Sequence, residues 1–390
     1  MEVANQTSIH TNLSQSDSKS DSKSSRTNMP LQVIQKEKGF LILMVLGFAA
    51  TILFYQTPQI AMWLGFGFAA YSAIANDSIQ TIGTFIGSNG DKKWWVLWLF
   101  IGLIFLATVT YSWIVFDGDV SFQRLLSTDK VSGELLYPHP SSFNFLQIAA
   151  PLILLLITRL KMPVSTTFLL LSAFTISAGG ISQMISKSLG GYAIAFALSI
   201  VVYLVLNNLV RKHFSSRKPA KGWVVAQWLT SGALWSIWVM QDAANIAVYL
   251  PRQLDIYQFL GFSLCIFFGL GLLFYLRGDK IQGIVTEKTQ ITDMRAATLV
   301  NLVYSLIMLY KLTVSTIPMS TTWVFLGLLG GREIAMNFMR RKEGNAHTFK
   351  AIRLAGKDIL YASFGLIVSV LIAMGVNDGV RADILSLFHF

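Results

Sequence analysis

Long apolar stretches separated by short polar breaks run along most of the chain. The stretches are roughly 17 to 29 residues long, enough for a helix to cross a hydrocarbon layer about 30 Å thick. A soluble α/β protein would instead show short apolar runs broken by polar turns. The pattern therefore predicts an all-α polytopic membrane protein within a lipid bilayer. The predicted segments are Phe40–Thr57, Ile60–Ser88, Trp94–Phe116, Phe143–Leu160, Pro163–Ser186, Gly191–Val210, Trp223–Leu250, Ile256–Leu276, Ala296–Leu312, Pro318–Phe338 and Ile359–Gly375.

Two of these segments are longer than the others and hold a carboxylate. Ile60–Ser88 and Trp223–Leu250 would each be about 40 Å long as a continuous helix. The first contains Asp77 and the second contains Asp242. An ionised group inside a bilayer is costly unless it faces a cavity or a partner. We therefore expect a break or an unwound turn near each aspartate.

Two short motifs occur twice, in the same order. Residues 75–80 (ANDSIQ) recur as residues 240–245 (MQDAAN), and residues 162–167 (MPVSTT) recur as residues 317–322 (IPMSTT). The aspartate precedes the proline by 86 positions in the first copy and by 76 in the second. The shared order and similar spacing indicate an internal repeat.

The charges of the connections predict that the two copies are inverted. Basic residues at 92–93, 211–221, 277–295 and 339–357 place these connections in the cytoplasm, whereas the acidic connection 117–142 lies outside. Lys92 and Lys93 follow the first aspartate segment, but the basic residues 211–221 precede the second. The two segments thus run in opposite directions. We predict two inverted repeats, with broken helices or helical hairpins that meet at the midplane.

The predicted organisation has four parts. Residues 1–38 form a disordered, Ser-rich cytoplasmic tail; 39–189 and 190–340 form the two transmembrane repeats; and 341–390 contain a basic linker, a final transmembrane helix and a short tail. The N-terminus is expected in the cytoplasm; the membrane of residence stays open. Hydrophobic residues make up 53% of the chain and charged residues 13%. The net charge of +11 does not indicate nucleic-acid binding, because the basic residues lie in short connections.

The two motifs favour different ligands. Carboxylate and amide oxygens around each aspartate suit Na⁺ or another hard cation. The Pro-x-Ser-Thr-Thr motif is typical of a helix N-terminus, where hydroxyl and N–H groups bind an anion. The cation-coupling candidates are Asn76, Asp77, Gln80, Gln241, Asp242 and Asn245, with Na⁺ at Asp77 and Asp242. The anion-binding candidates are Ser165, Thr166, Thr167, Ser320, Thr321 and Thr322.

At these motifs the chain resembles the inorganic phosphate transporter (PiT) family of cation-coupled phosphate symporters. The family carries a GANDVANA signature in each half, followed by PVSTTH. Residues 75–77 and 163–167 match that pattern, and 242–245 and 318–322 match it in part. The resemblance covers about residues 40 to 340 and implies the inverted-repeat fold and a homodimer. It also implies a central phosphate bound by the Ser/Thr motifs together with Asn76, Asp77 and Asp242.

The chain departs from the family pattern at several positions. Gln80 replaces the second Asn of the first signature, and Gln241 replaces an Asn in the second. The histidine that follows Ser-Thr-Thr is Phe168 in one copy and Trp323 in the other. These departures indicate a divergent member, in which the anion and the coupling ion follow less directly than the fold.

The leading hypothesis is Na⁺- or H⁺-coupled symport of inorganic phosphate, with no cofactor beyond the coupling ion. Protonated phosphate can donate a hydrogen bond to an aspartate, whereas sulfate has no proton to donate. Transport of sulfate or another tetrahedral oxyanion is the first alternative. A non-transporting membrane receptor or scaffold is the second. We do not expect an enzyme, because aspartyl chemistry would leave the Ser/Thr motifs without a role.

Overall fold

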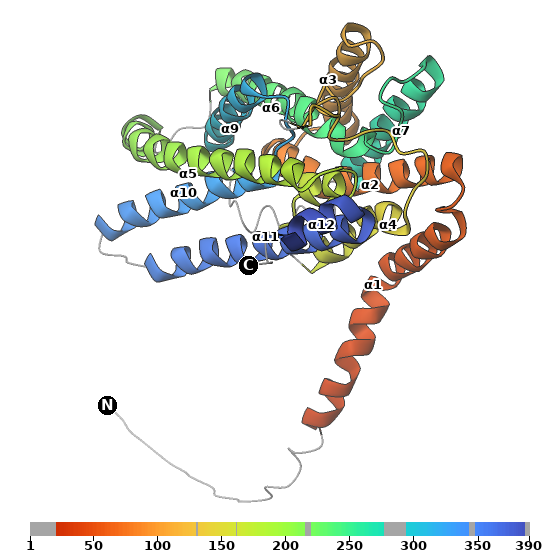
Figure 1. The fold of residues 1–390 in the computed structure, drawn as a ribbon. Helices are drawn as coiled ribbons and strands as arrows, with labels where there is room; N and C mark the ends of the chain where they lie inside the picture. Colours follow the sequence, from red (N-terminus) through yellow and green to blue (C-terminus); the bar gives the residue numbers. More distant parts are fainter. Residues whose placement is uncertain are drawn as a thin grey trace, which may run out of the picture. The chain divides into compact units, whose positions relative to one another are not determined.

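The computed structural model describes residues 21–129, 132–160, 162–214, 220–276, 294–342 and 348–386. Across these ranges the regular elements are helices, and the chain forms no β-strand apart from an isolated bridge between Thr128 and Leu135 (Figure 1). Parts of the predicted tail and of the basic connections lie outside the described residues. These are residues 1–20, 215–219, 277–293 and 343–347.

The chain divides into two compact units, Met1–Ala49 and Ala50–Phe390. Helix α1 (Asp21–Phe54) begins inside the stretch predicted to be a disordered tail. Once a helix is nucleated in the apolar stretch, each added residue extends it at little cost. Gln, Lys and Glu at 35–38 are good helix formers, so the polar sequence before Phe40 continues the helix.

The two helices that carry the aspartates are antiparallel. At the C-terminal end of α2 (Pro58–Ser88), Asn89 Nδ2 donates to Gln227 Oε1 at 2.8 Å, near the start of α6 (Lys221–Ala247). At the other end, Gly65 of α2 lies against the ring of Tyr249, just after α6. The equivalent segments of the two copies therefore run in opposite directions, as predicted.

The helices that follow the two aspartate helices are also antiparallel to each other. Trp98, near the start of α3 (Trp94–Val115), donates its ring N–H to Phe267 O of α7 (Ile256–Tyr275) at 2.9 Å. Near the end of α3, the Trp113 ring N–H donates to Leu254 O, just before α7, at 2.8 Å. Helices α3 and α7 are thus antiparallel counterparts.

The expected breaks at the aspartates are not found. Both α2 and α6 continue through Asp77 and Asp242 without interruption. Side chains from other segments satisfy the Asp242 carboxylate, as described below, so the helix need not release its own backbone groups. An unbroken helix also keeps every backbone hydrogen bond, which matters most at the depth of a bilayer.

The chain breaks instead at the two Pro-x-Ser-Thr-Thr motifs. In the first copy, α4 (Phe145–Arg159) leads to the non-helical residues 162–165 and then into η1 (Thr167–Leu171), a short π-helical segment. In the second, α9 (Met294–Val314) leads through residues 315–320 into α10 (Thr321–Lys342). Each motif is therefore the tip of a helical hairpin.

The segments predicted after the first motif need correction. Pro163–Ser186 is not one span, because η1 ends at Leu171 and a new helix, α5 (Ala178–Phe214), begins seven residues later. Helix α5 includes the predicted segment Gly191–Val210, and the predicted division between repeats at residues 189 and 190 falls inside it. Three backbone groups after η1 bond to distant parts of the fold. Ala173 O accepts from Gln147 Nε2 at 3.0 Å, Thr175 O accepts from Asn377 Nδ2 at 3.2 Å, and the Ile176 N–H donates to Leu136 O at 3.2 Å. These tertiary bonds stop the helix.

The outer helices expose regular apolar stripes. Helix α7 exposes Leu260, Leu264, Phe268 and Leu272 at a spacing of four residues, which places them on one helix face. Six helices are long and apolar enough to cross a membrane, counting only described residues: α1, α3, α5, α7, α9 and α11 (Thr348–Val376). The chain is thus an all-α, multi-pass integral membrane protein. Helix α12 (Asp378–Ser386) follows α11 and is short.

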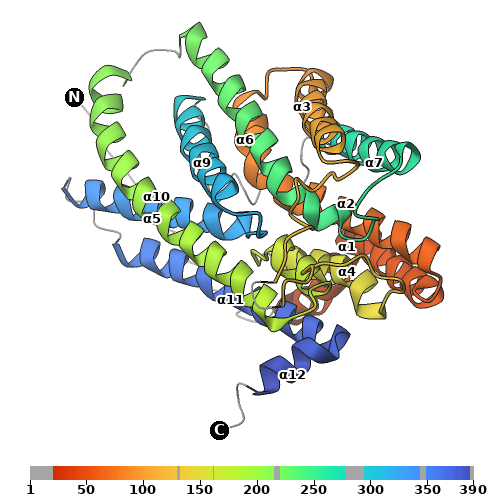
Figure 2. The same ribbon diagram turned by 45° about the horizontal axis from the view of Figure 1, so that its top comes forward.

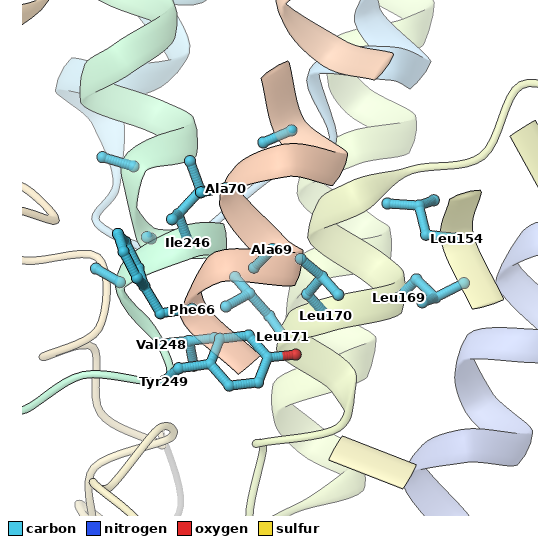
Figure 3. Close-up of a cluster of buried hydrophobic side chains, with 14 of the residues drawn as sticks. Phe66, Ala69, Ala70, Leu154, Leu169, Leu170, Leu171, Ile246, Val248 and Tyr249 are labelled. Atoms are coloured by element: carbon cyan, nitrogen blue, oxygen red, sulfur yellow. The ribbon is translucent and has the colours of Figure 1, made fainter. Parts of the chain in front are cut away.

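Two apolar clusters surround the hairpin tips. The larger one joins α2, η1 and the end of α6, where Phe66, Leu170 and Tyr249 lie close together (Figure 3). The smaller one joins α5, α6, α9 and α10 and includes Tyr304 and Val324. In both ribbon views, α5 runs along α10, and α9 lies beside α6 (Figures 1 and 2). The hairpin tips are thus held between packed helices.

Helices α5 and α10 approach closely through two glycines. A Cβ added to Gly327 would collide with the backbone of Tyr192, and one added to Gly331 with Phe196 O. We expect Gly327→Ala and Gly331→Ala each to lower the thermal unfolding midpoint in detergent, because overpacking costs about 1–3 kcal/mol. Gly67→Ala is the control, since its Cβ would meet nothing within 4 Å. An unchanged midpoint in both α10 variants would contradict the close contact.

Candidate functional site

The site is built around the carboxylate of Asp242, which is 1% exposed on α6. Thr321 Oγ1 donates to one carboxylate oxygen at 2.7 Å. Asn245 Nδ2 and Thr167 Oγ1 donate to the other, at 3.0 and 3.3 Å. An ionised carboxylate only accepts hydrogen bonds, and all three groups can donate one to it. The donors come from both repeats.

The serines of the two motifs act as helix caps. Ser165 Oγ accepts from the Phe168 N–H at 3.1 Å, and Ser320 Oγ accepts from the Trp323 N–H at 3.2 Å. Both bonds link a serine to the residue three positions later, which is the usual N-cap geometry. Ser188 Oγ of α5 also accepts from the Ser320 N–H at 2.9 Å. The predicted anion-binding serines thus start the helices and orient the threonines that follow.

The amides next to the aspartates make equivalent contacts within each repeat. Asn76 Nδ2 donates to Val164 O at 3.5 Å, and Gln241 Nε2 donates to Met319 O at 3.4 Å. Both amides directly precede an aspartate, and both carbonyls belong to the residue after the motif's proline. The repeat found in the sequence is therefore present as a pair of matching contacts.

The second amide of each copy reaches across to the other repeat. Gln80 Nε2 of α2 donates to Thr322 Oγ1 at 3.3 Å. Asn245 Nδ2 of α6 donates to Thr167 Oγ1 at 3.1 Å. Thr167 and Thr322 are the third hydroxyl residues of their motifs. These crossed bonds join the two repeats at the site. Gln80 stands where the PiT pattern has Asn, and its bond to Thr322 corresponds to the bond from Asn245 to Thr167.

Several buried polar atoms at the site have no hydrogen-bond partner within the described part of the chain. They are Thr166 Oγ1, Gln241 Oε1 and Asn245 Oδ1. Buried polar atoms are normally paired, and those left unpaired often mark a missing ligand. Amide and hydroxyl oxygens are ligands that hard cations accept. The described residues contain no group of three or more His, Cys, Asp or Glu that could bind a metal ion.

Asp77 follows Asn76 on α2, and its backbone is helical. Its side chain lies outside the described part of the structure, so Na⁺ binding at Asp77 stays a prediction. The structure thus brings together Asp242, Asn245, Thr167 and Thr321 directly. Gln80 and Thr322 form a second, crossed pair beside them.

The two residues that replace the family's histidines lie against each other. The rings of Phe168 and Trp323 are 6.0 Å apart, centroid to centroid, and meet edge to face at 70°. Both are buried, and Trp323 also packs edge to face on Tyr192 of α5. An apolar contact therefore joins the two helix starts where the family pattern places polar rings.

Two basic residues that the sequence pattern does not predict lie near the site. Arg124, from the connection 117–142, donates to Leu312 O at 3.0 Å and to Ser315 O. Lys187 of α5 donates to Ser315 O at 2.9 Å and to Ile317 O. The sequence offered a weak signal for Lys187, a charge between two apolar stretches. Arg124 was read only as part of an acidic connection.

Comparisons with known proteins support the fold. No family model and no curated protein sequence matches the chain. A solved structure named "The sodium-dependent phosphate transporter" is similar, with a TM-score of 0.50 and 19% sequence identity. The match covers 82% of this chain and 98% of that chain. At this identity the match shows a shared fold.

The hydrogen bond from Thr321 gives a direct test of the Asp242 environment. We expect Thr321→Val to lower stability by about 1.5–3 kcal/mol, because it removes a donor to a buried charge. Thr321→Ser keeps the hydroxyl and should lose much less. Thermal unfolding in detergent measures both variants. A larger loss in Thr321→Ser than in Thr321→Val would show that the methyl group, rather than the hydrogen bond, stabilises the site.

Proposed function

We propose that this protein is a secondary active transporter that carries inorganic phosphate together with a cation, Na⁺ or H⁺. One observation carries the proposal: a buried carboxylate, Asp242, receives hydroxyl donors from the hairpin tips of both inverted repeats. Inverted repeats that meet around a polar site are a common plan of secondary transporters, because rocking one repeat against the other exposes the site to each side in turn.

The cation would bind among the oxygens around Asp242. The unpaired amide oxygens of Gln241 and Asn245 lie on the same helix as the carboxylate. One negative charge and several neutral oxygens suit a monovalent cation. Asn76, Asp77 and Gln80 would provide the equivalent site in the first repeat. A proton on an aspartate is the alternative coupling ion.

The anion would bind to the threonine hydroxyls. Thr166 and Thr321 occupy equivalent positions, and the Thr166 hydroxyl is buried without a partner among the described residues. An aspartate repels a dianion, so bound cations must lie between them, which is the physical basis of coupling. The carboxylate also accepts a hydrogen bond from protonated phosphate but gains none from sulfate.

The similar solved structure supports this choice of substrate, because its name states sodium-dependent phosphate transport. We further propose that the N-terminus lies in the cytoplasm, from the basic connections, and that the protein forms a homodimer. Asp242 accepts hydrogen bonds from hydroxyl and amide donors, which supports a role in binding.

Uptake of radiolabelled phosphate into proteoliposomes tests the proposal. We expect uptake to rise with an inward Na⁺ gradient. Asp242→Asn should lower that stimulation by about 5- to 150-fold, the range of typical coupling energies. Asp91→Asn is the matched control, because Asp91 is 71% exposed and pairs with its neighbour Lys92 at 3.0 Å. Such surface pairs contribute little.

The pattern of results separates the alternatives. Uptake driven only by a pH gradient would replace Na⁺ with H⁺ as the coupling ion. Competition by sulfate at the same concentration as phosphate would indicate a general oxyanion transporter. Folded protein with no uptake under either gradient would refute transport of phosphate and favour a receptor.

A further inference from the structure

Three cationic side chains gather beside the second hairpin tip. Arg124 and Lys187 both donate to Ser315 O, three residues before Pro318. Lys311 is in the last turn of α9, and its Nζ lies against Gly190 of α5, about one helical turn from Lys187. We call Arg124, Lys187 and Lys311 the basic cluster. It lies on the side of the fold that connection 117–142 covers.

The connection 117–142 is folded so that Arg124 points inward. The Asp119 carboxylate accepts from the Ser121 N–H at 2.8 Å and from the Gln123 N–H at 2.6 Å. Phe122 and Gln123 have φ angles of 53° and 62°, the left-handed region that most residues avoid. This turn leaves Arg124 only 2% exposed. Its position is therefore determined by a specific local structure.

The basic cluster lacks negative partners. None of its three side chains forms an ion pair with a carboxylate in the described ranges. The Arg124 Nε is buried and has no hydrogen-bond partner there. Carbonyl oxygens such as Ser315 O offer partial charge only. Bringing like charges together away from water is unfavourable unless an anion joins them.

The cluster is electrostatically linked to the central site. Burial lowers the pKa of Arg124 to about 10, and the negative charge of Asp242 opposes that shift. The guanidinium therefore stays charged at neutral pH. An anion held at the cluster would be close to the site, and the positive charges would offset its repulsion by Asp242.

We propose that Arg124, Lys187 and Lys311 form a second anion subsite, which binds a tetrahedral oxyanion without a coupling cation. A guanidinium and two lysine amino groups suit such an anion, because each donates hydrogen bonds to its oxygens and a bound anion favours their protonated forms. The subsite rests on the proposed function only for its role, which is to collect phosphate before it reaches the central site. Its ability to bind does not depend on transport.

Equilibrium binding of radiolabelled phosphate to the full chain in nanodiscs tests the subsite. We expect a Na⁺-independent component that weakens as ionic strength rises. The double variant Lys187→Gln/Lys311→Gln should weaken this component about tenfold or more, since each charged hydrogen bond contributes at that scale. These lysines are only partly buried, so the variant is less disruptive than one at Arg124.

The control double variant is Lys92→Gln/Lys93→Gln. It removes the same charge from exposed positions after α2 and should leave the Na⁺-independent component unchanged. Asp242→Asn should remove the Na⁺-dependent component and keep the other. Equal losses in the two lysine double variants, or no loss in Lys187→Gln/Lys311→Gln, would overturn the subsite. A third outcome separates the two proposals. If only Lys187→Gln/Lys311→Gln loses the Na⁺-independent binding and the wild type shows no Na⁺-dependent binding, the subsite is supported and Na⁺ coupling is refuted.

Discussion

The need to satisfy a buried carboxylate organises the centre of this protein. Asp242 lies away from water, where an unpaired charge would cost several kcal/mol. Its donors come from α6 itself and from the tips of two hairpins. Both hairpin tips must therefore reach the same point. The serine caps and the non-helical residues that precede each helix start place the threonines there.

Because the two repeats are antiparallel, equivalent residues of both repeats can meet at one site. Each amide before an aspartate bonds within its own repeat, and each amide three residues after it bonds across to the other. The same short motif thus serves both repeats, since inversion brings equivalent groups face to face. The repeats differ after the motif: η1 is five residues long and α10 is 22. Tertiary hydrogen bonds to residues 173–176 account for that difference.

Charge is divided between two neighbouring regions. The central site combines a carboxylate with neutral hydroxyls and amides, whereas the cations lie next to it on carbonyls of the second hairpin. A dianion near Asp242 alone would be repelled, and a cation near Arg124 alone would be repelled too. In the proposed function, the two regions together would accept an anion and a cation close to each other, which is the electrostatic arrangement that coupled transport needs.

The sequence by itself determined the membrane class, the two motifs and the inverted orientation of the two copies. Apolar length and the placement of basic residues carry that information locally, because both depend on the bilayer rather than on neighbouring helices. The sequence predicts that Gln80, Thr322, Asn245 and Thr167 belong to one site. It does not predict that Gln80 pairs with Thr322 or that Asn245 pairs with Thr167.

Only the tertiary structure decided where the chain breaks and which cations join the site. Helices α2 and α6 stay continuous because side chains from distant hairpins satisfy Asp242, which no local pattern reveals. Arg124 reaches the site through a turn held by Asp119, 191 positions before its partner Ser315. Contacts between residues so far apart depend on packing, and packing is a property of the whole fold.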